Sequence, residues 1–222
     1  SHKARFTLID ADGNEKASTI ADLRPIISAK LPVEDPVLWN GRKNPYLYTV
    51  RCEIFDSTTQ EVTDNIDIRT GLREYHIDSH KGFFLNGEHI KLQGVSRHQD
   101  RENMGNAITE KQHAEDVKII LDVGANSVRL AHYQQNSYFY DLCDESGLLV
   151  WAEVPVISRF SPKRNENAEQ QLVELIKQNY NHPSIFCWGI ENEITIAGSA
   201  SKKLITFLKH MHKVARHLDP TR

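Results

Sequence analysis

Four apolar runs in the second half of the chain end in polar side chains of the kinds that transfer protons or bind polar substrates. The first ends at residues 96–100, the second contains Arg129 and ends at His132, the third ends at Glu153, and the fourth ends at residues 191–193. Each has an ordinary structural explanation when taken alone, such as a surface histidine, a paired arginine or an aspartate that closes a turn. Together they suggest one shared site, because the carboxyl ends of neighbouring parallel strands meet at one edge.

The elements that would carry these side chains are short strands alternating with amphipathic helices after Gly71. We expect strands at 90–95, 127–131, 148–152 and 184–188, and helices at 109–124, 137–145, around 172–176 and at 204–218. Thr109 and Gln112 form a capping box, and Gly147 suits the end of a helix. This alternation predicts parallel strands joined by crossovers. It fits an open doubly wound sheet or half of a (β/α)8 barrel, although no glycine-rich phosphate loop supports a dinucleotide fold.

The first seventy residues have a different pattern. Short runs of alternating polarity at 5–9, 47–55 and 62–69 are separated by polar turns and show no helical period. Strands at this spacing predict a small antiparallel sandwich. Because the Cys–Trp–Cys pattern of antibody domains is missing, we describe it only as Ig-like. We therefore expect two domains, an Ig-like β-sandwich at 1–71 and an α/β domain at 72–222.

The composition argues against several classes of protein. The 222 residues are 39% hydrophobic and 26% charged, with a formal net charge of −3, which gives no electrostatic case for binding nucleic acid or an anionic membrane. The three cysteines lie far apart and show no spacing typical of a metal or redox motif. No apolar run reaches the roughly 18 residues that a membrane span needs.

Several ordered motifs resemble one enzyme family, glycoside hydrolase family 2. The motifs are residues 94–100, 125–133 with 140–147, 181–184 with 188–193, and upstream 38–39 and 45–48. The resemblance covers essentially the whole chain and implies an Ig-like β-sandwich followed by the first four βα units of a (β/α)8 TIM barrel. Within the family, residues 150–155 and the Asn-Glu-Ile sequence at 192–194 resemble β-galactosidases. Gln134 and Glu191 depart from the pattern, which often has Pro and Gly there.

The resemblance also implies a mechanism, because such enzymes retain anomeric configuration and use two carboxyl groups. Glu193 corresponds to the general acid/base, which we expect to be partly buried. Asn192 would bind the sugar 2-OH, and His132 and His98 would line the subsite for the terminal sugar. Three further residues would orient these groups from behind: Arg129, Asp100 and Glu153.

We expect a β-galactoside as substrate, with a β-glucuronide or another β-glycoside of the same family as the alternative. The family's nucleophile is a glutamate on the seventh barrel strand, so we expect the 222 residues to be a fragment that is inactive alone. Half a barrel leaves the edges of its outer strands unpaired, so we also expect the fragment to self-associate. We expect the parent protein to be a homo-oligomer. Two other functions are a non-catalytic carbohydrate-binding fragment and an unrelated α/β enzyme for phosphorylated substrates, which would need a glycine-rich loop. We assign no cofactor and no metal ligand in this chain, although the parent protein could bind Mg²⁺ or Na⁺. The sequence is compatible with a cytoplasmic or a periplasmic location.

Overall fold

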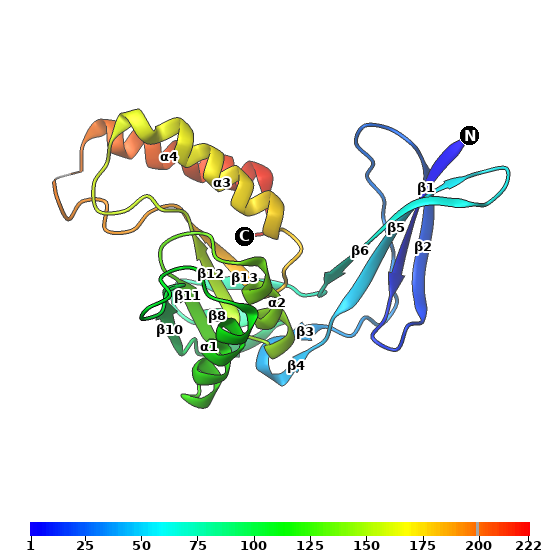
Figure 1. Ribbon diagram of the computed structural model, residues 1–222, viewed down its shortest axis with the longest axis horizontal. Coiled ribbons are helices and arrows are strands. Elements are labelled where there is room, and N and C mark those ends of the chain that lie inside the picture. The colour runs from blue at the N-terminus through cyan, green and yellow to red at the C-terminus, as the bar shows by residue number, and fades with distance from the viewer. Residues whose placement is uncertain (199) are drawn as a thin grey trace.

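The computed structural model describes residues 1–198 and 200–222. Figure 1 shows a β-sheet at one end of the molecule and a mixed α/β part at the other. The sheet is antiparallel throughout and has the order β2-β1-β5-β6. Its strands are β1 (His2–Ile9), β2 (Glu15–Asp22), β5 (Tyr48–Asp56) and β6 (Val62–Thr70).

The sandwich prediction for this region is met only in part. The strands predicted at 5–9, 47–55 and 62–69 are present as β1, β5 and β6. Within the described residues, however, they form one sheet and no second sheet packs over it. Ala4 and Leu8 are buried on one face of this sheet, whereas Ile66 on β6 keeps 57% of its surface exposed.

A short hairpin connects this sheet to the α/β part. It consists of β3 (Trp39–Asn40), the 3-10 turn η1 (Gly41–Lys43) and β4 (Asn44–Pro45). Trp39 is completely buried, and its indole Nε1 donates to the Asp144 carbonyl at 2.8 Å. Because a buried indole N–H needs an acceptor, this bond fixes the hairpin against the α/β part.

The strand predicted at 90–95 is two strands with different partners. β7 (Tyr75–Asp78), β8 (Gly82–Leu85) and β9 (Glu88–Ile90) form an antiparallel sheet, and β10 (Gly94–Arg97) begins the parallel one. Between β9 and β10, the Asn126 side chain accepts from Gln93 N at 2.8 Å and donates to the Lys91 carbonyl at 2.8 Å. These bonds occupy backbone groups that a continuous strand would have offered to a neighbouring strand.

The α/β part is built on a parallel sheet with the order β10-β11-β12-β13. The remaining elements are β11 (Ser127–Leu130), β12 (Leu149–Glu153), β13 (Ile185–Gly189), α1 (Glu110–Asp122), α2 (Ser137–Ser146), η2 (Pro162–Arg164), α3 (Asn165–Asn179) and α4 (Lys202–Leu218). Helices α3 and α4 run side by side (Figure 1). No helix in the described part of the chain is long and apolar enough to span a membrane.

Local sequence signals and one apolar core explain this arrangement. The capping box between Thr109 and Gln112 begins α1, and Gly147 ends α2 with a left-handed φ of 72°. The main core lies between the helices and one face of the parallel sheet, and its fully buried members include Leu130, Val150 and Leu172. The carboxyl ends of all four strands are thereby held at one edge.

Candidate functional site

The carboxyl end of the parallel sheet brings four of the predicted site residues into one hydrogen-bonded network. Arg129 Nε donates to Glu153 Oε1 at 2.5 Å, and Arg129 Nη2 donates to Asn192 Oδ1 at 2.7 Å. His132 Nδ1 lies 2.8 Å from Glu153 Oε2. The network joins β11, the loop after it, the last residue of β12 and the segment after β13. Parallel, adjacent strands therefore produce the convergence that the sequence predicts.

Glu153 is the electrostatic centre of this network. Its side chain is fully buried, whereas Arg129 keeps 35% and His132 keeps 20% of their side-chain surface exposed. A buried carboxylate is tolerated when charge and hydrogen bonds compensate it, and Arg129 supplies both. Because the ionised carboxylate can only accept, the His132 proton in this bond is on Nδ1. The Nε2 atom of His132 has no hydrogen-bond partner among the residues that the structure describes.

His98 joins the site through its ring, and its side chain makes no hydrogen bond to the residues that the structure describes. The His98 and His132 ring centroids are 5.3 Å apart at 82°, and Tyr133 lies 6.0 Å from His98. Tyr133 also fixes the loop after β10, because its hydroxyl accepts from the backbone N–H of Gln99 at 3.0 Å. Asp100 is exposed and has no hydrogen bond or ion pair to any residue that the structure describes. The structure thus places His98 beside His132 and leaves Asp100 apart.

Asn192 is held at its backbone as well as its side chain. Its N–H donates to the Val156 carbonyl at 2.9 Å, and its carbonyl accepts from Ser158 N at 3.0 Å. Glu193 follows in a left-handed conformation with φ of 50°. Its side chain is exposed, so the partial burial expected for it is not found in these residues. In the described chain its carboxyl makes no hydrogen bond or ion pair.

A second polar cluster beneath the site was missed at the sequence level. Arg97 is 6% exposed, donates to Asp116 Oδ2 through Nε at 2.9 Å and Nη2 at 2.7 Å, and donates to Gln135. Its guanidinium also lies 3.9 Å from the Phe139 ring centroid. The Arg97 carbonyl accepts from Gln135 Nε2 at 3.1 Å, which supports the loop after β11. No spacing signal reveals this cluster, because its members come from distant parts of the chain.

His113 belongs to this cluster and is held neutral. Arg97 Nη2 lies 2.9 Å from His113 Nδ1, and a guanidinium can only donate, so Nδ1 accepts and the proton is on Nε2. His113 is 1% exposed, and Nε2 has no hydrogen-bond partner among the residues that the structure describes. Burial, followed by the positive charge of Arg97, lowers the pKa of His113 below its ordinary value.

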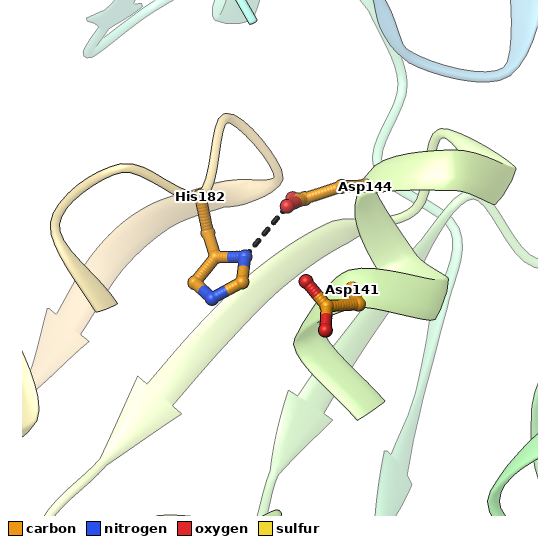
Figure 2. A group of neighbouring side chains, drawn as sticks. All are labelled: Asp141, Asp144 and His182. Atoms are coloured by element: carbon orange, nitrogen blue, oxygen red, sulfur yellow. Dashed lines mark hydrogen bonds and ion pairs between the residues drawn. The ribbon is translucent and has the colours of Figure 1, made fainter. Parts of the chain in front are cut away.

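One other group of side chains has the spacing of metal ligands (Figure 2). Asp141, Asp144 and His182 have ligand atoms within 4.8 Å of one another. His182 Nδ1 already bonds Asp144 Oδ2 at 2.6 Å, and Asp141 pairs with Arg69 at 3.1 Å. A metal ion would have to displace these partners. The group lies on α2 and just before β13, and not at the carboxyl edge where Asn192 lies.

Family comparisons assign both halves of the chain. The family model "Glycosyl hydrolases family 2, TIM barrel domain" matches residues 77–222, and "Glycosyl hydrolases family 2" matches residues 1–73. The chain belongs to glycosyl hydrolase family 2. The resemblance drawn from the motifs is thereby confirmed. In the structure, β6 ends at Thr70, shortly before the first match ends, and β7 begins at Tyr75, within the gap between the two matches.

Relatives within family 2 carry two kinds of name. A β-glucuronidase of Bacteroides fragilis is 42% identical over 201 residues, which are 86% of this chain and 28% of that protein. A β-galactosidase of Thermoanaerobacter pseudethanolicus is 31% identical over 97% of this chain and 28% of its own length. A crystal structure titled as an FMN-binding β-glucuronidase from Facaelibacterium prausnitzii has a TM-score of 0.94 at 42% identity, covering 100% of this chain and 34% of that one. The chain thus spans about a third or less of these relatives.

Proposed function

We propose that this family 2 chain is part of a retaining β-glycosidase in which Glu193 is the general acid/base. The observation that carries this proposal is the bond from Arg129 to Asn192, because it fixes the residue that precedes Glu193 at the carboxyl edge of the sheet. The parallel strands of the α/β part would be the first half of a (β/α)8 barrel, whose active site lies at that edge. Residues 1–71 and 72–222 would be the two domains.

Each residue of the network has a distinct role in this mechanism. Glu193 protonates the glycosidic oxygen as the bond from that oxygen to C1 breaks, and a carboxylate nucleophile from elsewhere in the protein bonds to C1. Glu193 then removes a proton from the water that hydrolyses the glycosyl-enzyme intermediate. Because Arg129 occupies Oδ1 of Asn192, the Nδ2 amide group of Asn192 is directed to donate to the sugar 2-OH. His132 Nε2 and His98 line the sugar subsite, held by Glu153 and by Tyr133.

For the substrate we propose a terminal β-glucuronide first and a β-galactoside second. The motif at 150–155 and the Asn-Glu-Ile sequence favour a galactoside. The relatives named β-glucuronidase include the one that is 42% identical, whereas the β-galactosidase cited above is 31% identical. The network at the carboxyl edge contacts the part of the sugar near C1 and C2 in this mechanism, and both substrates share that part.

We further propose that the isolated 222 residues are inactive and self-associate. The outer strands β10 and β13 each have one neighbour, so backbone groups and an apolar face are left uncovered. On the face opposite the main core, Trp151 is 38% exposed. Light scattering should show a species larger than the 25.4 kDa monomer at high concentration, and a strict monomer would contradict this part of the proposal.

The test of the function uses the complete glycosidase, meaning the longer protein that we propose contains this chain. Hydrolysis of nitrophenyl β-glucuronide and nitrophenyl β-galactoside is measured for the wild type and for Glu193→Gln. We expect a preference for the glucuronide and a loss of about 10²–10⁴-fold in the variant. Wild-type rates in Glu193→Gln would contradict the role of Glu193, whereas a preference for the galactoside would change only the substrate.

A further inference from the structure

The turn after β13 contains a hydrogen bond that the proposed chemistry does not use. The carboxylate of Glu191 accepts from the backbone N–H of Ile194 through Oε2 at 3.1 Å. Ile194 is 7% exposed and belongs to the main apolar core. A buried backbone N–H needs an acceptor, and in this turn Glu191 provides it.

Glu193 lies between two fixed points of the backbone. On one side, Asn192 is held by the bonds from its main chain to Val156 and Ser158. On the other side, Ile194 is held by Glu191 and by its burial in the core. The only residue between these points is Glu193, which adopts a φ of 50°.

This left-handed backbone is unfavourable for a residue with a Cβ atom. Its Cβ atom is crowded by the following carbonyl oxygen, so surrounding contacts must stabilise this conformation. The Glu193 carbonyl accepts from Ile196 N at 2.9 Å, which closes the turn that follows. The sign of φ at Glu193 decides on which side of the turn its side chain emerges. Contacts that fix this φ therefore fix the direction of the carboxyl group.

We propose that Glu191 is a positioning residue that holds Glu193 in its left-handed conformation and so directs the Glu193 carboxyl group. The proposal rests on the proposed function of Glu193 as acid/base. Glu191 acts through its oxygen as a hydrogen-bond acceptor, and its charge is not required. Glutamine at this position keeps an acceptor oxygen at the same distance from the backbone, whereas alanine has none.

Hydrogen exchange of the Ile194 amide tests the contact on the 222-residue chain itself. In Glu191→Ala we expect this amide to exchange about 5–150-fold faster, the range that corresponds to one buried donor losing its acceptor. In Glu191→Gln it should stay within about threefold of the wild type, because the acceptor is retained. Glu166→Ala, which removes an exposed carboxylate on α3, is the matched control. Unchanged exchange in Glu191→Ala would overturn the proposal.

Kinetics of the complete glycosidase test the positioning. We expect Glu191→Ala to lower kcat by about 10–100-fold with KM changed less than about threefold, since a misplaced acid affects chemistry more than ground-state binding. Glu191→Gln should restore kcat and keep the wild-type pH profile. Faster Ile194 exchange with unchanged kcat in Glu191→Ala would also overturn the proposal. Full activity of Glu193→Gln would instead overturn the proposed function, and the exchange experiment would still report the contact.

Discussion

Arg129 and Glu153 form an ion pair at the centre of the site, in which Arg129 Nε donates to a carboxylate that is fully buried. The same guanidinium reaches Asn192, so the position of the Asn192 amide depends on the buried Glu153 carboxylate as well. Glu153 also fixes the proton of His132 on Nδ1. One buried carboxylate therefore determines the orientation of three side chains.

Glu153→Gln should destabilise the chain by about 2–4 kcal/mol. Breaking a fully buried ion pair typically costs more than this. Here the Arg129 side chain is 35% exposed, so water can solvate its charge and the cost is lower. Urea unfolding measures the change, with Glu166→Gln on the exposed face of α3 as the control. A loss below about 0.5 kcal/mol would show that the pair contributes no more than a surface contact.

The free energy of unfolding should decrease as the pH is lowered, because His113 titrates. Its folded-state pKa is lowered by burial and by Arg97, so the unfolded chain binds the proton more readily. The stabilisation that neutral His113 provides is therefore complete above its unfolded-state pKa of 6.5, and it is lost as the pH falls below that value. His113→Asn keeps an acceptor for Arg97 and does not titrate. Its free energy of unfolding should decrease less than that of the wild type between about pH 7.5 and 5.0, and parallel curves would contradict the prediction.

The two glycines that follow α1 and α2 should respond differently to alanine. Gly147 has φ of 72°, and a Cβ there would lie 2.2 Å from the Gly41 carbonyl oxygen. Gly124 has φ of 81°, but a Cβ added there would meet no atom of the described residues within 4 Å. We expect Gly124→Ala to cost about 1–2 kcal/mol from backbone conformation alone. Gly147→Ala should cost at least about 1–3 kcal/mol more from the clash. Equal losses in thermal unfolding would contradict the close approach of η1.

Arg69 should contribute little, although it joins the first sheet to α2. It pairs with Asp141 at 3.1 Å and with Glu145, and its side chain is 43% exposed. Exposed ion pairs of this kind are usually worth about 0.2–1 kcal/mol, because water and salt screen them. Arg69→Ala should therefore lower the free energy of unfolding by less than about 1 kcal/mol, with most of the difference gone in about 1 M salt. A loss of several kcal/mol would indicate that the two parts depend on this pair.

The convergence of Arg129, His132, Glu153 and Asn192 was predictable, because strand ends in a parallel sheet follow from the apolar runs and helix signals. The division of the predicted strand at 90–95 was not, since it depends on Asn126, which lies more than thirty residues away and binds the backbone there. The sandwich was predicted from the spacing of the strands, and this spacing does not reveal how the strands pair. The strands form one sheet, and the predicted second sheet is not found within the described residues.

Individual side-chain contacts were the least predictable feature. Arg97 lies in the same motif as His98, yet it turns to the opposite side of the sheet and contacts Asp116 and Gln135. The alternation of strand residues indicates the side but not the partner. The contact between Glu191 and Ile194 likewise depends on the backbone turn at Glu193, and no local sequence motif predicts this turn.

Azide rescue of Glu193→Ala in the complete glycosidase tests the central claim most directly, because azide can replace water as the attacking group without needing a general base. With an activated aryl β-glycoside, we predict that azide accelerates turnover of the variant and that the product is the β-glycosyl azide. No acceleration, or formation of the α-glycosyl azide, would contradict the assignment of Glu193 as the acid/base of a retaining glycosidase.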